Sequence, residues 1–167
     1  IETQMLALAT VSSKATLPTA MHELRNKIGV SKQSSSFILP LGAAVNMDGV
    51  AIYLGICTVF FAQLMGIELT LSQYIIVMFA ATIGSVGAAG FPGGSMVMMS
   101  MVLTSVGLPL EGMSLILGVD RVLEMVRTAV NITGDCTVTV LIDKMERTFN
   151  HNIYYSKDED DDMEDDD

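Results

Sequence analysis

The feature that most constrains this chain is a long apolar stretch, residues 36–142, which polar or glycine-rich segments interrupt at intervals. Half of all residues are hydrophobic, only 17% are charged, and the mean hydropathy is +0.49. Such a composition excludes a disordered chain, which buries too little apolar surface to fold. With Cys57 and Cys136 as the only cysteines, the sequence also excludes a disulfide scaffold.

The first interruption lies inside residues 36–65, where Asn46, Met47, Asp48 and Gly49 separate two apolar runs. The whole segment is longer than the about 20 residues that cross a bilayer. An aspartate at the centre of a membrane helix costs about 2.5–3.5 kcal/mol on insertion scales. Membrane proteins tolerate such a break only where it lines a cavity or is covered by protein. We therefore predict a broken transmembrane helix over 36–65.

The second interruption divides residues 71–106 into two apolar arms, 71–86 and 95–106, around the glycine-rich segment 87–94. Each arm is too short to span a bilayer alone. One continuous helix is excluded because the glycines and Pro92 would break it. The segment therefore predicts a re-entrant helical hairpin with a flexible tip.

The charges that flank these segments predict the membrane topology. Basic residues gather in 21–35 and in 143–147, whereas the connections 66–72 and 107–112 contain only the acids Glu68 and Glu111. The positive-inside rule places the basic segments in the cytoplasm and the two connections outside. We expect a multi-pass protein of the cell membrane, with lipid as one partner, a cytoplasmic connection over 21–35 and an acidic cytoplasmic tail over 143–167.

A polar stripe interrupts the last apolar segment, 113–142, which we predict to be the final transmembrane helix. Its members recur mostly every three or four residues, so a helix places them on one face. They are Asp120, Glu124, Arg127, Thr128, Asn131 and Asp135. Ionisable residues inside a membrane are functional candidates by default, although a polar network that only holds helices together is the alternative.

The chemistry of the stripe favours small charged solutes. The guanidinium of Arg127 is a planar fork that fits a carboxylate. Oxygens of Asp and Asn, together with carbonyls of unwound backbone, suit a hard cation such as Na⁺. Broken helices near the middle of the membrane are typical of secondary transporters. No Ser/His/Asp or Cys/His arrangement can be assembled, so we expect no enzyme. The chain has no basic surface for nucleic acid.

These motifs jointly resemble the dicarboxylate/amino acid:cation symporters, the glutamate transporter family. The matching segments are SSKATLP at 12–18, LPLG at 39–42 with NMDG at 46–49, GAAGFP at 87–92, and the stripe from Asp120 to NITGD at 131–135. The resemblance implies an all-α membrane protein that forms part of an elevator-type transport domain. Residues 1–20 would be the tip and second arm of a first re-entrant hairpin. Six helices and one hairpin arm would precede Ile1, and the full-length parent would be a homotrimer.

The resemblance also implies binding residues. Substrate would contact Ser12, Ser13, Met47, Gly90, Phe91, Glu124, Arg127, Thr128 and Asn131, with Arg127 at the distal carboxylate. One Na⁺ would lie at Gly42, Asn46, Asn131 and Asp135, a second at Ala44, Ser85, Val86 and Ala88, and a third partly at Asn46 and Asp48.

Four positions depart from the family pattern. Glu124 stands where the family usually has an aspartate for the substrate amino group, and Val50 replaces a threonine. Lys14 replaces a third serine at the hairpin tip. Leu54 replaces a protonatable glutamate of proton-coupled relatives, so we expect no proton coupling through that position.

The sequence therefore predicts sodium-coupled symport of acidic amino acids, glutamate or aspartate. A C4-dicarboxylate:cation symporter is the alternative that Glu124 and Val50 favour. A membrane fragment that does not itself transport is a third hypothesis.

Overall fold

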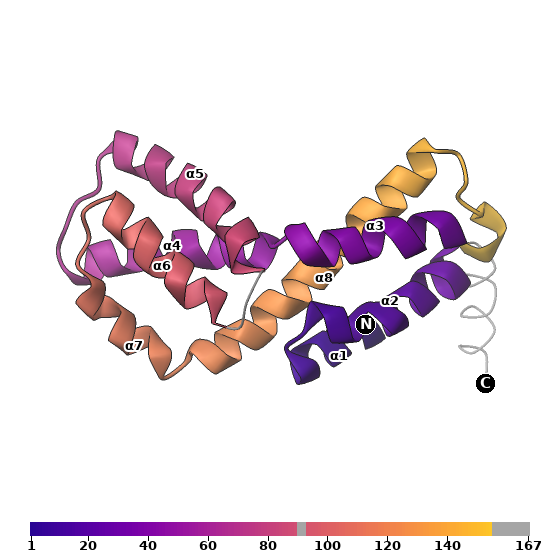
Figure 1. The fold of residues 1–167 in the computed structure, drawn as a ribbon, viewed down its shortest axis with the longest axis horizontal. Coiled ribbons are helices and arrows are strands. Elements are labelled where there is room, and N and C mark those ends of the chain that lie inside the picture. The colour runs from indigo at the N-terminus through magenta and orange to yellow at the C-terminus, as the bar shows by residue number, and fades with distance from the viewer. Residues whose placement is uncertain (90–92, 155–167) are drawn as a thin grey trace, which may run out of the picture.

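The computed structural model describes residues 1–89 and 93–154, and the secondary structure of these residues is entirely helical. The all-α prediction is thereby confirmed. Figure 1 shows two groups of helices, with the long helix α8 running diagonally between them. One group contains α1 (Glu2–Thr10), α2 (Ser13–Glu23) and α3 (Lys32–Val45). The other contains α4 (Asp48–Leu64), α5 (Leu71–Ala88), α6 (Gly94–Ser105) and α7 (Met113–Leu117), and α8 is Asp120–Met145.

The first 23 residues form two helices that pack together, α1 and α2. Between them, Val11 adopts a left-handed conformation with φ 53°, and the Ser12 hydroxyl caps α2 by accepting from the Ala15 amide at 3.2 Å. The structure differs here from the expected tip and second arm, because residues 2–10 form a helix of their own. Their sequence, ETQMLALAT, is rich in good helix formers.

The segment 21–35 is more ordered than a plain connection. A π-helical turn, Leu24–Ile28, extends α2 and ends at Gly29, whose φ of 90° favours glycine. α3 then starts at Lys32, four residues before the expected 36, because the Ser31 hydroxyl caps it by accepting from the Ser34 amide at 3.2 Å.

The helix predicted over 36–65 is broken in the structure. α3 ends at Val45 and α4 begins at Asp48, so Asn46 and Met47 are non-helical between them. Among the described residues, two stretches are long and apolar enough to cross a membrane, Lys32–Leu64, which contains this break, and Leu71–Ala88.

The segment 71–106 folds as two helices, α5 and α6, that lie side by side. Thr70 and Gln73 form a capping box that starts α5. The end of α5 lies close to the start of α6. A Cβ on Gly94 would lie only 2.4 Å from the carbonyl oxygen of Ala88. The tip residues Gly90–Pro92 lie outside the described residues.

The final segment is two helices instead of one. α7 ends at Leu117, and α8 starts at Asp120 and runs for 26 residues. Gly118 and Val119 separate them. Glycine is unfavourable inside a helix because it loses more backbone freedom there than other residues do. The polar stripe nevertheless lies entirely within α8.

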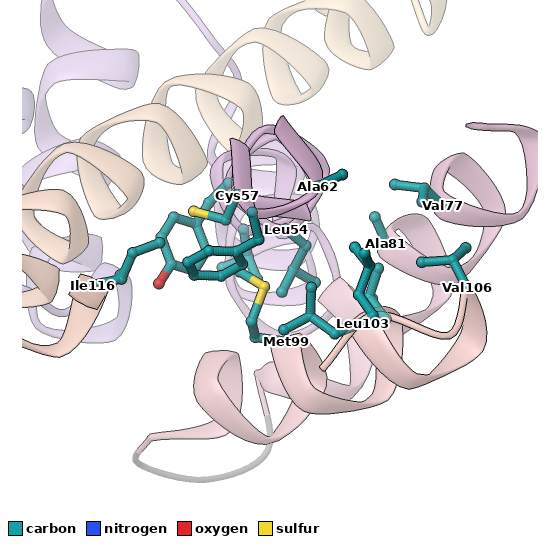
Figure 2. Close-up of a cluster of buried hydrophobic side chains, with 14 residues drawn as sticks. Leu54, Cys57, Ala62, Val77, Ala81, Met99, Leu103, Val106 and Ile116 are labelled. Atoms are coloured by element: carbon teal, nitrogen blue, oxygen red, sulfur yellow. The ribbon is translucent and has the colours of Figure 1, made fainter. Parts of the chain in front are cut away.

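Each of the two groups of helices has its own hydrophobic core. Figure 2 shows the core of the second group, where Leu54 of α4 meets Ala81 of α5 and Leu103 of α6. The core of the first group joins Ala7, Leu39 and Ile132 from α1, α3 and α8. Leu54 is fully buried in the second core.

Large apolar side chains also cover much of the outer surface. Phe37 is 71% exposed, Ile56 is 64% exposed and Ile83 is 69% exposed. Large exposed apolar surfaces mark contact with a membrane or with another protein. The surface therefore supports lipid or further protein as the surroundings of these helices.

A set of hydrogen bonds around Asp143, here called the polar clasp, joins the end of α8 to the start of α3. Buried Asp143 accepts hydrogen bonds from the Ser31 amide and hydroxyl, at 3.1 and 2.6 Å, and from the Thr148 hydroxyl at 2.5 Å. Burial alone would raise the pKa of Asp143, but these hydrogen bonds outweigh it and hold the pKa below its usual range. Asn150 donates its backbone amide to the Gly29 carbonyl at 2.8 Å and closes the clasp.

Candidate functional site

The polar stripe of α8 faces the interior of the protein. Arg127, Thr128, Asn131 and Asp135 are buried, whereas the apolar residues on the other side of the helix are exposed. Those outward residues are Val122, Val126, Val130 and Val138. This pattern is the inverse of a helix on the surface of a soluble protein. The polar groups of α8 therefore serve an internal site.

Arg127 is held by two neighbours. It is only 5% exposed, and its Nη1 donates to Asp120 Oδ1 at 3.0 Å. Its guanidinium carbon lies 3.9 Å from the centroid of the Tyr53 ring, a cation–π contact. The Tyr53 hydroxyl donates to the same Asp120 oxygen at 3.0 Å. These contacts fix the plane of the guanidinium and balance its charge.

Glu124, one turn before Thr128, is the acidic partner in a second ion pair of α8. Arg121 donates to its Oε2 at 3.0 Å, and the two side chains are 71% and 37% exposed, respectively. The ion pair is therefore partly in solvent, where such pairs contribute little stability. Glu124 is free to exchange Arg121 for another cation.

A cavity of about 310 Å³ lies where the two groups of helices meet. Four segments far apart in the sequence line it: the α1–α2 turn, the α3–α4 break, the ends of α5 and α6 that flank the tip, and the stripe of α8. The lining residues are Val11, Ser12, Ser13, Lys14, Ala43, Met47, Val50, Ala88, Ala89, Gly93, Gly94, Ser95, Glu124, Arg127, Thr128 and Asn131.

The structure thus brings seven of the nine expected substrate residues to one cavity. They are Ser12, Ser13, Met47, Glu124, Arg127, Thr128 and Asn131. The other two, Gly90 and Phe91, lie outside the described residues. Val50 lines the same cavity, and it presents methyl groups where a threonine would present a hydroxyl.

The α3–α4 break is fixed to the stripe by Asn131. The Gly49 amide donates to Asn131 Oδ1 at 2.7 Å, and Asn131 Nδ2 donates to the Met47 sulfur at 3.2 Å. The backbones are in close contact here, because a Cβ on Gly49 would lie 2.5 Å from the Arg127 carbonyl oxygen. The break and the stripe therefore form one unit.

The fold brings together three members of the first expected cation set, Gly42, Asn46 and Asp135. Asn46 Nδ2 donates to Asp135 Oδ1 at 3.2 Å and to Asp48 Oδ2 at 3.1 Å. Gly42 faces Asp135 so closely that a Cβ there would lie 2.7 Å from Asp135 Oδ1. Within the described part of the chain, the buried Asp135 Oδ2 has no hydrogen-bond partner. A buried oxygen without a partner is costly, so it fits a cation ligand.

The second expected cation set is not gathered in the same way. Ala44 is exposed near the end of α3, whereas Ser85, Val86 and Ala88 lie near the end of α5. The Ser85 hydroxyl donates to the Thr82 carbonyl within its own helix at 2.8 Å. No hydrogen bond between described residues joins Ala44 to this end of α5. This set therefore rests on the resemblance alone.

Two residues of the site were not among the binding residues expected from the sequence. Asp120 belongs to the stripe, and its spacing of seven residues places it on the same helix face as Arg127, two turns away. Tyr53 had no local signal, because its contact with Arg127 joins α4 to α8. Only the fold reveals that it stacks on the guanidinium.

Comparisons with known proteins agree with this geometry. Residues 1–145 match the model of the sodium:dicarboxylate symporter family. The chain is 42% identical over 143 residues to excitatory amino acid transporter 3 of Mus musculus, covering 86% of this chain and 27% of the relative. It is 44% identical over 129 residues to an excitatory amino acid transporter of Caenorhabditis elegans, covering 77% and 26%.

A bacterial relative extends the match to nearly the same region. The proton/sodium-glutamate symport protein of Geobacillus stearothermophilus is 39% identical over 146 residues, which cover 87% of this chain and 34% of the relative. The chain therefore spans about a quarter to a third of the length of these relatives. All three are named as transporters or symporters. Since the family model matches most of the residues, the chain belongs to the sodium:dicarboxylate symporter family.

Proposed function

We propose that this chain contributes the substrate and sodium sites of a symporter that moves acidic amino acids, glutamate or aspartate, across the cell membrane together with Na⁺. The observation that carries the proposal is Arg127, a buried cation with a fixed plane in the wall of a polar cavity. A guanidinium binds a carboxylate through two parallel hydrogen bonds. Names of relatives such as excitatory amino acid transporter and glutamate symport protein support the same substrate class.

In this proposal, the polar residues that line the cavity bind different groups of the substrate. Arg127 holds the distal carboxylate of the substrate, and Asn131 with the Ser12–Ser13 turn holds the other. Glu124 turns from Arg121 to the amino group. Gly90 and Phe91, which lie outside the described residues, are the remaining substrate contacts of this proposal.

Sodium is the co-substrate, and the residues of the first cation set fit it. The unpartnered carboxylate oxygen of Asp135, with the oxygens of Gly42, Asn46 and Asn131, is a hard oxygen set of the kind that Na⁺ prefers. Asp48 adds a carboxylate beside Asn46 for a further ion. The set Ala44, Ser85, Val86 and Ala88 completes the proposed ion sites.

The proposed membrane arrangement follows the charges and the family. Residues 21–35 and the acidic tail lie in the cytoplasm, and α5 with α6 forms a re-entrant hairpin that covers the cavity. The chain acts within an elevator-type transport domain, and the full-length protein is a homotrimer. The exposed apolar faces of α3, α4 and α5 support surroundings of lipid or further helices.

The test is thermal unfolding of the full-length protein that carries these residues, in detergent, with and without Na⁺. Aspartate, glutamate, succinate and serine are added in parallel. A ligand that binds only the folded state raises its apparent stability. The proposal expects a rise with aspartate or glutamate that requires Na⁺. No response to either amino acid in the presence of Na⁺ would refute it.

A C4-dicarboxylate substrate is the second candidate, and two observations favour it. Glu124 is already paired with Arg121 at 3.0 Å, so its carboxylate does not need an ammonium group from the substrate. Val50 also gives the cavity an apolar wall where a hydroxyl could have met an amino acid. A sodium-dependent rise with succinate and none with aspartate would select this candidate.

A further inference from the structure

Lys14 is the unbalanced charge of the cavity. Three charged side chains line it: Lys14, Glu124 and Arg127. Arg127 has Asp120 at 3.0 Å, and Glu124 has Arg121 at the same distance. Among the described residues, Lys14 has no carboxylate within ion-pair distance. Lys14 therefore biases the cavity toward positive potential, and the bias favours an anion.

The groups around Lys14 match a carboxylate. Lys14 occupies the first turn of α2, an 11-residue helix. The Ser12 hydroxyl and carbonyl accept from the Ala15 and Thr16 amides, which leaves the amides of Ser13 and Lys14 without acceptors among the described residues. The Ser13 side chain is 8% exposed and lines the cavity, and its hydroxyl has no described partner. Amides at a helix N-terminus, a free hydroxyl and an ammonium group are suited to an anion.

The two cations enter the cavity from different elements. Arg127 comes from α8, and Lys14 comes from the first turn of α2. A substrate with two carboxylates can therefore place one at each cation. We propose that Lys14, with the N-terminal turn of α2, binds the α-carboxylate of the substrate and makes the site selective for it. This inference rests on the proposed function, in which Arg127 holds the distal carboxylate.

Two amides of aspartate separate the roles of the two cations. Asparagine keeps the α-carboxylate and lacks the distal one, whereas isoasparagine keeps the distal carboxylate and lacks the α one. The variant Lys14→Met keeps the length of the side chain and removes its charge. We expect it to weaken aspartate binding about twofold to fivefold, the effect of a partly exposed charge pair. The binding of asparagine should weaken by the same factor, and the binding of isoasparagine should be nearly unaffected.

The dissociation constants are measured by competition against labelled aspartate in saturating Na⁺, with the full-length protein in detergent. Lys32→Met is the matched control, because Lys32 is an exposed lysine that does not line the cavity. Lys14→Arg should restore most of the affinity. The inference is overturned if the preference for aspartate over isoasparagine is unchanged in Lys14→Met, or if Lys32→Met lowers it equally.

The same measurements distinguish this inference from the proposed function. Sodium-dependent aspartate binding in the wild type, with an unchanged preference in Lys14→Met, overturns the role of Lys14 and leaves the function standing. If labelled succinate binds and aspartate does not, the assignment of an amino acid as substrate is overturned. In that case, a loss of succinate affinity in Lys14→Met and none in Lys32→Met supports Lys14 as a carboxylate ligand. No sodium-dependent binding of either ligand overturns both proposals.

Discussion

Replacing Arg127 by alanine tests the central contact of the site. The side chain is buried, and its charge-assisted bond to a substrate carboxylate would contribute about 1.5–3 kcal/mol. Loss of that free energy raises the dissociation constant about 10- to 150-fold. We expect this change for aspartate and glutamate. Serine, which has no second carboxylate, should lose much less.

The structure also predicts a cost to folding, which the experiment must separate from binding. Removing one partner of a buried ion pair costs about 3–5 kcal/mol. The Asp120 side chain is 19% exposed and keeps its hydrogen bond from Tyr53, so the cost here should fall below that range. The double variant Arg127→Ala with Asp120→Ala removes both charges. It should recover part of the stability and none of the preference for aspartate.

The assay is calorimetric titration of the full-length protein with aspartate and serine in saturating Na⁺, together with thermal unfolding of each variant. Arg127→Lys serves as a third variant. It keeps a positive charge but loses the planar fork and the stacking on Tyr53, so its aspartate affinity should stay well below the wild type. An equal loss of affinity for aspartate and serine in Arg127→Ala would refute the assigned role.

Three further changes have definite expectations. Asp135→Asn should raise the sodium concentration for half-maximal aspartate binding by about tenfold or more, because a charged ligand is lost; an unchanged sodium titration would contradict the cation site. Gly49→Ala should lower the free energy of unfolding by about 1–3 kcal/mol, because its Cβ would lie 2.5 Å from the Arg127 carbonyl oxygen. The matched control is Gly55→Ala, where a Cβ meets nothing within 4 Å and denaturant unfolding should show no comparable loss. Asp143→Asn should destabilise by about 1–3 kcal/mol at pH 7, since charged hydrogen bonds are lost. The pKa of Asp143 is lowered by folding, so its stabilisation is present above about pH 4 and disappears as the pH falls through the folded pKa. Unfolding of wild type and variant at pH 7 and pH 3 checks this, and the same difference at both values would count against it.

The parts of the fold that the sequence predicted have a local cause. The helix break at Asn46 and Met47 follows from polar residues in an apolar run, and the structure places it at those residues. The inward face of α8 follows from the spacing of its polar residues, and Arg127, Asn131 and Asp135 are indeed buried. Both inferences require only helical geometry and the cost of burying charge.

The parts that sequence reasoning missed depend on contacts between distant segments or on weak local preferences. The stacking of Arg127 on Tyr53 joins residues of α8 and α4, and nothing in either segment indicates it. The break at Gly118 was missed because a single glycine costs a helix only about 1 kcal/mol, which packing often outweighs. Helix α1 was missed because its nine residues have no strong apolar periodicity.

The bond between Arg127 and Asp120 has a consequence for turnover. Asp120 bonds a single nitrogen of the guanidinium, Nη1, at 3.0 Å, and the group has five N–H donors, so donors remain for a carboxylate without the loss of this bond. In the function proposed above, the ion pair would stay in place while the substrate binds and leaves. The buried charge of Arg127 would then never be without a counter-charge, and release of the substrate would leave no bare cation behind.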